Sequence, residues 1–421
     1  MKPYPPAKTI RYKKSHRMVL PVEQLQVGMY VAELDRPWEE TNFLFQGFLL
    51  ENEDDVRLVR EQCESVTVDI LSSVDVELGR RGAPAAKTRR VEKQLSVERA
   101  LPKAQTAYTQ TRSLVSNILD DVRLGKTVNT PEAKEAVGAC VDSVMENPDA
   151  LMLMTRLRNK DEYTAEHSLS VSILSIALGR QIGLERAQLN ELGLCGMLHD
   201  VGKMMIPDEI LNKPGSLSDG EMAIMEQHTV HGRDILMSTP DLPGEAPDVA
   251  HNHHERINGS GYPRGLRAEN LTWYTKLVSV VDTFDAITSD RIYQRGQTNM
   301  AAFKILTQGR GTSWDPDLVF QFIEAVGIYP PGSVAQLSSG EIVVVLESNP
   351  KLKLRPKVLV INANMEIGRM RVIDLAETSH DREGQRLYIA RMLHPRDAGV
   401  DLDAMREMGI FGELGTSERL P

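Results

Sequence analysis

Cysteine is scarce in this sequence: only Cys63, Cys140 and Cys195 occur among 421 residues. Their number is odd and no two of them form a CxxC pair, so the sequence predicts neither a disulfide framework nor a cysteine-rich zinc site. This usage is typical of a protein that works in a reducing compartment.

Long hydrophobic runs and an excess of positive charge are also lacking. No stretch approaches the roughly 20 apolar residues that cross a bilayer, and the basic N-terminus lacks the apolar run of a signal peptide. The 49 Lys and Arg against 59 Asp and Glu give a net charge of -10, which disfavours DNA binding because phosphate contact needs a basic face. We therefore expect a cytoplasmic protein with no membrane span and no DNA partner; the oligomeric state stays open.

The residue pattern predicts a multidomain α+β protein. Short runs of Val, Phe and Leu broken by Gly and Pro indicate strands after Val19, and apolar residues at spacings of three and four indicate helices from 95 to 330. Strand patterns return after 332, with a turn at Ser339-Gly340. The expected segments are a basic tail at 1–18, a small mixed N-terminal domain with a linker at 19–94, a helical linker at 95–134, an all-α bundle at 135–331, a β-rich subdomain at 332–395 and a tail at 396–421.

Histidine is concentrated in the helical part, which holds seven of the ten histidines between residues 167 and 254. Two acids accompany them: Asp200 follows His199 at a predicted helix end, and Asp282 lies inside the apolar run LVSVVDTFDAI. A carboxylate buried in such a run is unfavourable unless a cation or hydrogen bonds compensate, so we favour metal binding over a structural, helix-capping Asp282. The glycine at 202 allows close approach of backbone and ligands, and adjacent His and Asp can bind two ions with the carboxylate bridging.

The candidate metal ligands are separated by roughly one helix and a turn each, so each can come from a separate helix and converge inside one bundle. They are His167, His199, Asp200, His228, His253, His254 and Asp282. Imidazole with carboxylate suits iron, manganese, nickel, cobalt or zinc. His231 and His251 fall outside the spacing, and we expect them near the site or in solvent.

These motifs resemble the HD-GYP family, a branch of the HD phosphohydrolase superfamily. The matching stretches are YTAEHSLSV, GMLHDVGK, EQHTVHG, HHERINGSGYP and VVDTFDAITSDRIY, and the resemblance covers about 135 to 390. Residues 19 to 75 also resemble a small domain that often precedes HD-GYP domains and has no settled role.

The resemblance implies an HD-type helical bundle with two divalent metal ions, iron or manganese before nickel, cobalt, zinc or magnesium. By position, one ion takes His167, His199, Asp200 and Asp282, and the other takes Asp200, His228, His253 and His254. Some members hold a third ion through a Glu four residues before the first histidine. That position is Tyr163 here, which favours a binuclear centre, although Glu162 and Glu166 are nearby.

A binuclear centre suits phosphodiester hydrolysis, because two ions supply hydroxide near neutral pH and neutralise charge on a phosphoryl oxygen. Lys203, four residues after His199, would bind a phosphate oxygen beside Asp200, unless it is only a solvated lysine after a helix end. The loop with Gly261, Tyr262 and Pro263 would form a wall of the site. Tyr262 either stacks on a base or packs the loop.

The family substrate is cyclic di-GMP, cut to pGpG and often on to GMP. Arg291 matches a residue expected to bind phosphate or guanine. This chain departs from the family at Gln294, where a basic residue is usual, and at Asn258, where Asp is usual. The Gln294 change weakens the expected substrate affinity, whereas Asn and Asp both suit turns.

The leading hypothesis is a cyclic di-GMP phosphodiesterase of bacterial signalling, which can also have protein partners in that signalling. The alternatives are an HD phosphohydrolase for another cyclic nucleotide and a cyclic di-GMP receptor or interaction module with little turnover. The Gly-Tyr-Pro motif favours cyclic di-GMP over another cyclic nucleotide as the substrate. The complete ligand set favours an enzyme over a receptor with little turnover.

Overall fold

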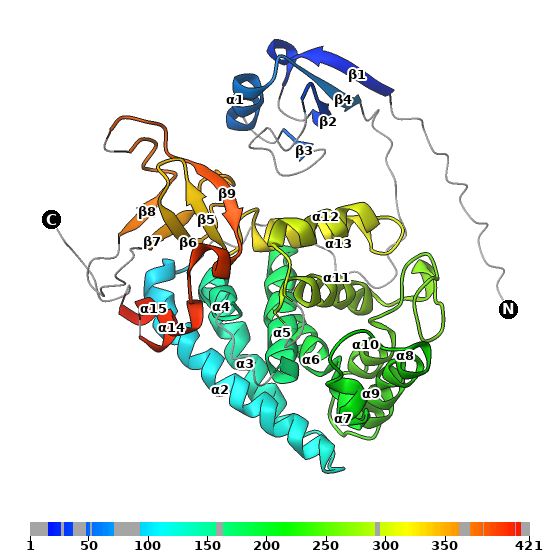
Figure 1. The fold of residues 1–421 in the computed structure, drawn as a ribbon. Helices are drawn as coiled ribbons and strands as arrows, with labels where there is room; N and C mark the ends of the chain where they lie inside the picture. The colour runs from blue at the N-terminus through cyan, green and yellow to red at the C-terminus, as the bar shows by residue number, and fades with distance from the viewer. Residues whose placement is uncertain are drawn as a thin grey trace. The chain divides into compact units, whose positions relative to one another are not determined.

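The computed structural model describes most of the chain, which divides into two compact units, Met1–Arg80 and Arg81–Pro421 (Figure 1). The described residues are 16–26, 29–36, 48–50, 53–70, 93–156, 163–290, 295–361, 371–381, 383–408 and 410–413. Among the helices of these residues, none has both the length and the hydropathy needed to span a bilayer.

The first unit contains a four-stranded antiparallel sheet in the order β1-β4-β2-β3, with one α-helix. Its elements are β1 (His16–Pro21), η1 (Val22–Gln24), β2 (Tyr30–Leu34), β3 (Phe48–Leu49), α1 (Glu53–Gln62) and β4 (Ser65–Ile70). Val66 and Val68 alternate along β4 and are buried against Val31, Val56 and Val59 of the same core, as a strand with one face on a core requires.

The second unit is a helical bundle with a sheet at one end. The helices are α2 (Val97–Arg123), α3 (Thr130–Glu146), α4 (Pro148–Met154), α5 (Tyr163–Gln181), α6 (Arg186–Leu198), η4 (Val201–Met205), α7 (Asp208–Leu211), α8 (Asp219–Glu226), α9 (His228–Met237), α10 (Glu245–Asn252), η5 (Ala268–Asn270), α11 (Trp273–Thr288), α12 (Asn299–Gly309) and α13 (Pro316–Val326).

Helix starts follow the side chains that can cap them. Ser218 and Glu221 form the predicted capping box at the start of α8, and the Thr272 hydroxyl accepts the Thr275 N–H at the start of α11. Each cap satisfies an N–H group that the helix itself leaves without a partner. Asp282 lies nine residues after Trp273, the first residue of α11.

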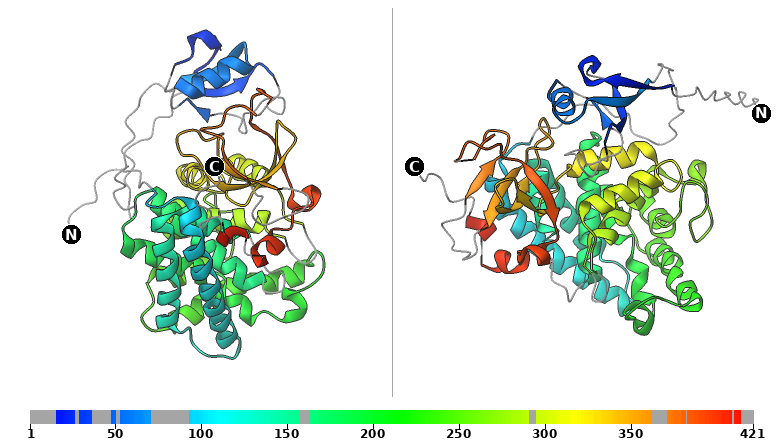
Figure 2. Two further views of the ribbon diagram at one scale, coloured as in Figure 1. Left: turned by 90° about the vertical axis from the view of Figure 1, so that its left-hand side faces the viewer. Right: turned by 45° about the horizontal axis from the view of Figure 1, so that its top comes forward.

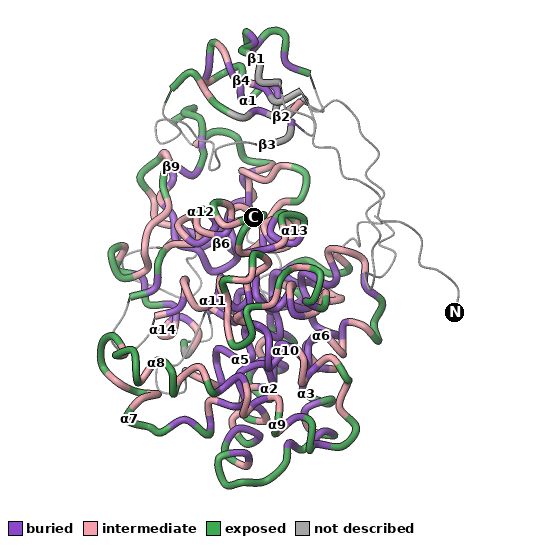
Figure 3. Tube along the Cα trace, turned by 90° about the vertical axis from the view of Figure 1, so that its right-hand side faces the viewer, coloured by how far each residue is buried: buried purple, intermediate pink, exposed green. Residues whose placement is uncertain are grey.

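Helix α5 is central to the bundle, and it packs against α2, α3, α6, α11 and α13. Residues from Ala165 to Arg180 are all buried, and buried stretches of the chain are drawn purple in Figure 3. A helix that is buried on all sides has no solvent face, so any charged group on it must find a partner inside the bundle.

The C-terminal sheet has five antiparallel strands in the order β8-β7-β6-β5-β9. Its strands are β5 (Val334–Leu337), β6 (Ile342–Glu347), β7 (Lys357–Ile361), β8 (Val372–Asp374) and β9 (Ile389–Leu393). The predicted turn at Ser339-Gly340 joins β5 to β6, with Gly340 at a φ of +87°, a conformation that glycine adopts without strain. The chain continues through η6 (Pro395–Ala398), α14 (Leu402–Glu407) and α15 (Ile410–Glu413), and α15 contacts α2.

The C-terminal sheet lies at one end of the helical bundle in both views of Figure 2. Ion pairs join it to the bundle near the start of α2. Lys93 Nζ lies 2.6 Å from Asp149 Oδ2 at the start of α4 and 2.9 Å from Glu347 Oε1 at the end of β6. Lys357 on β7 also pairs with Glu98 on α2 at 3.0 Å. The predicted fold class is confirmed: the chain is a multidomain α+β protein with a helical bundle, a small sheet domain before it and a β-rich part after it.

Candidate metal centre

The seven predicted ligands come together inside the bundle from five helices. His167 lies in the first turns of α5, His199-Asp200 follow the last turn of α6, His228 begins α9, His253-His254 follow α10, and Asp282 lies in α11. Six of these side chains are less than 10% exposed, and His254 is 21% exposed. The structure therefore places every predicted metal ligand in one cluster.

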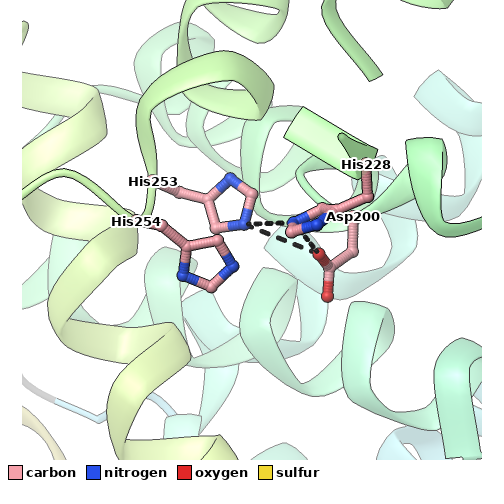
Figure 4. A group of neighbouring side chains, drawn as sticks. All are labelled: Asp200, His228, His253 and His254. Atoms are coloured by element: carbon pink, nitrogen blue, oxygen red, sulfur yellow. Dashed lines mark hydrogen bonds and ion pairs between the residues drawn. The ribbon is translucent and has the colours of Figure 1, made fainter. Parts of the chain in front are cut away.

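Asp200 lies between two groups of ligands. We call His167, His199 and Asp282 the first ligand group, and Asp200, His228, His253 and His254 the second; the ligand atoms of each group all lie within 4.8 Å of one another. Asp200 Oδ2 faces the first group, at 3.4 Å from His167 Nε2 and 3.2 Å from His199 Nε2. Asp200 Oδ1 faces the second, at 3.3 Å from His228 Nε2 and 3.5 Å from His253 Nε2 (Figure 4). One carboxylate can therefore contribute an oxygen to each group.

Backbone carbonyls set the orientation of three imidazole rings. His199 Nδ1 donates to Gly196 O at 2.7 Å, His228 Nδ1 donates to Met225 O at 2.7 Å, and His253 Nδ1 donates to Ala250 O at 3.1 Å. A carbonyl cannot donate, so the proton sits on Nδ1 and the Nε2 lone pair points toward the cluster. This tautomer is the one that binds a metal through Nε2.

His167 is oriented by a carboxylate instead. Its Nδ1 donates to Asp285 Oδ2 at 2.8 Å, and Asp285 is fully buried on α11, three residues after Asp282. The Ser289 hydroxyl also approaches Asp285 Oδ2 at 3.2 Å. A carboxylate partner raises the basicity of a metal-binding imidazole more than a carbonyl does, so His167 is the most strongly supported ligand of the first group.

The cluster has buried polar atoms that a cation would satisfy. His199 Nε2 and Asp200 Oδ1 are buried without a hydrogen-bond partner, and His228 Nε2 lies 3.4 Å from His253 Nε2. With both Nδ1 atoms protonated, these two nitrogens present lone pairs to each other, which is unfavourable without a positive charge between them. The residues present therefore fit two divalent ions.

The pKa values of the metal-free cluster follow from burial and from the two acids. Burial alone would raise the pKa of Asp200, but Lys203 and His199 hold it well below its usual range. Burial opposes protonation of His199, yet Asp200 and Asp282 outweigh it and raise the pKa of His199 to about 9. Burial, with Lys203 and His253 nearby, lowers the pKa of His228 to about 3. The second group therefore contains a histidine that is neutral at pH 7, whereas an ion at His199 must displace a proton.

The helix turn after Asp200 packs directly on the start of α9. A Cβ at Gly202 would lie 2.0 Å from His228 O and 2.4 Å from Gly232 N, so only glycine fits there. This contact confirms the close approach expected at residue 202. Lys203, in the same turn, places Nζ 2.5 Å from Asp200 Oδ2 and is 21% exposed, so its ammonium lies beside the Asp200 carboxylate and remains partly exposed to solvent.

A buried carboxylate holds the loop that follows the histidine pair. Glu255 is 2% exposed, and it accepts the Arg264 N–H at 2.7 Å and the Leu266 N–H at 2.9 Å. A Cβ at Gly261 would lie 2.4 Å from Glu255 Cα and 2.5 Å from His254 O. The loop therefore packs onto the backbone of the ligands themselves, which explains a glycine at this position.

Tyr262 stacks on a ligand. Its ring centroid lies 4.7 Å from that of His254, with the planes 27° apart, and Pro263 follows through a cis peptide bond. The stacking on His254 agrees with the second of the two interpretations of Tyr262, in which its ring packs the loop rather than a base. Burial, with Asp200 and Asp282 nearby, raises the pKa of Tyr262, so its phenol stays protonated at neutral pH.

Other candidate residues lie apart from the ligands or outside the described residues. Arg291 falls outside the described residues, as do Gln294 and Glu162. His251 is buried, and its Nε2 lies 3.4 Å from Arg233 Nη1. His231 is partly exposed on α9. Neither histidine belongs to a ligand group.

Sequence reasoning missed Asp285 and Glu255. Asp285 stands three residues after Asp282 on an apolar helix, so both acids lie on one buried face. This spacing of two acids could have indicated that Asp285 belongs to the site. Glu255 directly follows two histidine ligands and precedes a glycine-rich loop, but nothing local distinguishes it from a solvated Glu.

Comparisons with known proteins agree with this centre. The family described as HD domain matches residues 151–318, and the domain of unknown function DUF3391 matches residues 18–133. The chain is 36% identical over 349 residues to the cyclic di-GMP phosphodiesterase PA4108 of Pseudomonas aeruginosa, covering 81% of this chain and 84% of that protein. It is 34% identical over 184 residues to a cyclic di-GMP phosphodiesterase of Thermotoga maritima, covering 44% and 50% of the two chains. It is 30% identical over 171 residues to the 3'3'-cGAMP-specific phosphodiesterase 3 of Vibrio cholerae, covering 41% and 37%.

The helical bundle, the paired ligand groups and the family match define an HD-domain phosphohydrolase. The alignment with PA4108 extends well beyond the HD-domain match, because it covers 81% of the chain. The chain belongs to the HD-GYP family of phosphodiesterases.

Proposed function

We propose that this enzyme hydrolyses cyclic di-GMP to pGpG and on to GMP, with two divalent metal ions, iron or manganese in the first place. The observation that carries the proposal is the carboxylate of Asp200, whose two oxygens face two different sets of histidines. The substrate is supported by the relative PA4108, a cyclic di-GMP phosphodiesterase aligned over 81% of this chain.

The ligand groups would hold the two ions, with Asp200 shared between them. Two ions so held would supply hydroxide near neutral pH and neutralise charge on a phosphoryl oxygen. Asp200 and Asp282 are buried, and a lower local dielectric would strengthen the attraction of their carboxylates for bound cations.

Lys203 and the loop after His254 would hold the substrate. Lys203 presents a partly exposed ammonium next to Asp200, where it would bind a phosphate oxygen as a point charge. Gly261, Tyr262 and Pro263 would form a wall beside the second ligand group, since Tyr262 stacks on His254. We assign phosphate or guanine binding to Arg291 on the family motif alone. Asp200 and Lys203 are the proposed catalytic pair.

The test is a metal count and a substrate panel on one sample. The protein would be purified under low oxygen, its metals quantified, and its products from cyclic di-GMP and from 3'3'-cGAMP separated by chromatography. His228→Ala and His231→Ala form a matched pair, because both histidines lie in the first turns of α9 and only His228 belongs to a ligand group. We expect loss of metal and turnover with His228→Ala and near-wild-type behaviour with His231→Ala.

Three outcomes would change the proposal. Faster hydrolysis of 3'3'-cGAMP than of cyclic di-GMP would assign the enzyme to the other substrate, which the Vibrio cholerae relative acts on. Two bound metals with cyclic di-GMP binding but no turnover would make the chain a receptor. Equal effects of the two histidine variants would show that the second ligand group is not a metal site.

A further inference from the structure

A buried acid directly precedes the first metal ligand. Glu166 is 1% exposed on α5 and is bonded to His167 through the backbone. The Tyr108 hydroxyl donates to Glu166 Oε2, and Arg112 Nε lies 3.2 Å from Glu166 Oε1. A carboxylate at this depth is unfavourable without such partners, so these two contacts define where the Glu166 side chain lies.

Both partners of Glu166 come from one helix outside the set that carries the ligands. Tyr108 and Arg112 are four residues apart on α2 and therefore lie on the same face. Tyr108 is 2% exposed, and the Arg112 side chain is 22% exposed. Both residues belong to the region matched by DUF3391, residues 18–133, and lie upstream of the HD-domain match at 151–318.

The contact acts near the start of α5, on the residue directly before His167. Helix α5 begins at Tyr163, so Glu166 and His167 lie in its first two turns. Asp285 fixes the His167 ring from α11, but a hydrogen bond to the ring does not fix the rotation of the helix that carries it. The hydrogen bond from Tyr108 and the ion pair with Arg112 add a restraint from α2 on the residue next to His167.

We propose that Tyr108 and Arg112 are positioning residues that hold His167 in its metal-binding orientation through Glu166. The inference rests on the proposed metal centre and adds a role for a helix that lies upstream of the HD-domain match. We call the Tyr108 and Arg112 contacts to Glu166 the clamp. Loss of the clamp would weaken binding of an ion by the first ligand group. It would leave the second group unchanged, because its His228 and His253 are held by backbone carbonyls.

Metal-free protein titrated with Mn²⁺ tests the clamp, with free Mn²⁺ counted by electron paramagnetic resonance. Tyr108→Phe and Arg112→Gln each remove one partner of Glu166. Thr111→Val is the matched control, because Thr111 is buried on the same helix but donates to Ala136 O of α3 at 3.3 Å. His167→Ala and His228→Ala mark the titration steps of the first and second groups.

We expect Tyr108→Phe and Arg112→Gln to weaken the step marked by His167→Ala by about 10- to 100-fold, the range for residues that orient metal ligands. The step marked by His228→Ala should stay unchanged, and Thr111→Val should change neither step. Glu166→Gln, which keeps an acceptor for Tyr108, should lose less affinity than Glu166→Ala.

Unchanged Mn²⁺ affinity in both Tyr108→Phe and Arg112→Gln would overturn the clamp. Equal weakening of both steps, or weakening in Thr111→Val as well, would reduce α2 to a general stabilising element. The readout does not depend on turnover, so a wild-type protein that binds Mn²⁺ without cleaving cyclic di-GMP would refute the proposed function and leave this test intact. A wild-type protein that binds no Mn²⁺ would refute both.

Discussion

The contact between Gly202 and the start of α9 controls the distance between Asp200 and His228. A methyl group at residue 202 would lie 2.0 Å from His228 O, whereas real Cβ contacts are essentially never shorter than 3.0 Å. In Gly202→Ala the turn after Asp200 and the first turn of α9 must therefore separate by at least about 1 Å. The neighbouring atoms are backbone atoms of His228 and Gly232, so no side-chain rotation relieves the clash.

That separation acts directly on the second ligand group. His228 is the first residue of α9, and its Nε2 lies 3.3 Å from Asp200 Oδ1. A misplacement of about 1 Å costs on the order of 100-fold in rate, and overpacking of this kind costs about 1–3 kcal/mol of stability. We expect Gly202→Ala to bind one metal ion less at equal free metal, and to hydrolyse cyclic di-GMP about 100-fold more slowly.

Gly232→Ala is the matched control, because its added Cβ would meet Ala250 Cβ at 3.4 Å, an ordinary contact. Alanine also favours helix over glycine by up to about 1 kcal/mol, so Gly232→Ala should keep both metals and full activity with an equal or higher Tm. Metal content, kcat and Tm are measured on both variants. If Gly202→Ala keeps two ions and wild-type kcat, the reasoning that this backbone contact sets the Asp200–His228 distance is wrong.

Three further predictions concern protons, metal removal and the substrate loop. The pKa of His199 is raised to about 9 and that of His228 is lowered to about 3. Lowering the pH from 8 to 6 should therefore release the ion of the first group first, with a metal affinity that falls about tenfold per pH unit because one proton is displaced. Metal content after dialysis checks this, and equal release from both groups would contradict it. Chelation should lower Tm by several degrees, because an ion at 100 times its Kd adds about 2.7 kcal/mol; an unchanged thermal transition would argue against tight binding. Glu255→Gln should lose one hydrogen bond to the loop, which lowers the free energy of unfolding by about 1.5–3 kcal/mol. The variant should have a raised KM for cyclic di-GMP and unchanged metal content, and a normal KM would show that the loop does not contact substrate.

The convergence of the candidate ligands could be predicted from the sequence, because several of them carry a local signal. His199-Asp200 stands at the end of an apolar helix pattern, Asp282 lies inside one, and the intervals between the ligands match a helix and a turn. Local signals also predicted the helix start at Ser218 and the turn at Gly340. These features depend on residues within about one turn of each other, which a sequence displays directly.

The residues that support the ligands could not be predicted, because their partners lie far along the chain. Tyr108 reads as one more residue on the apolar face of a helix, and its partner Glu166 is 58 residues away. Glu255 reads as a solvated acid until the loop folds back on it. The short helices α14 and α15 have too few residues to show a period, and contacts such as that between α15 and α2 are not visible in the local sequence.

The convergence of five helices on Asp200 also bears on the conformational freedom of the unfolded chain. Ions held by the two ligand groups would cross-link the chain between residues 167 and 282 at several points, and each cross-link removes freedom from the unfolded chain. A single covalent cross-link that closes about 100 residues is worth about 4.7 kcal/mol in the chain-entropy treatment. The cysteines Cys63, Cys140 and Cys195 are buried and free, so in this protein metal coordination would take the structural place that disulfides hold in others.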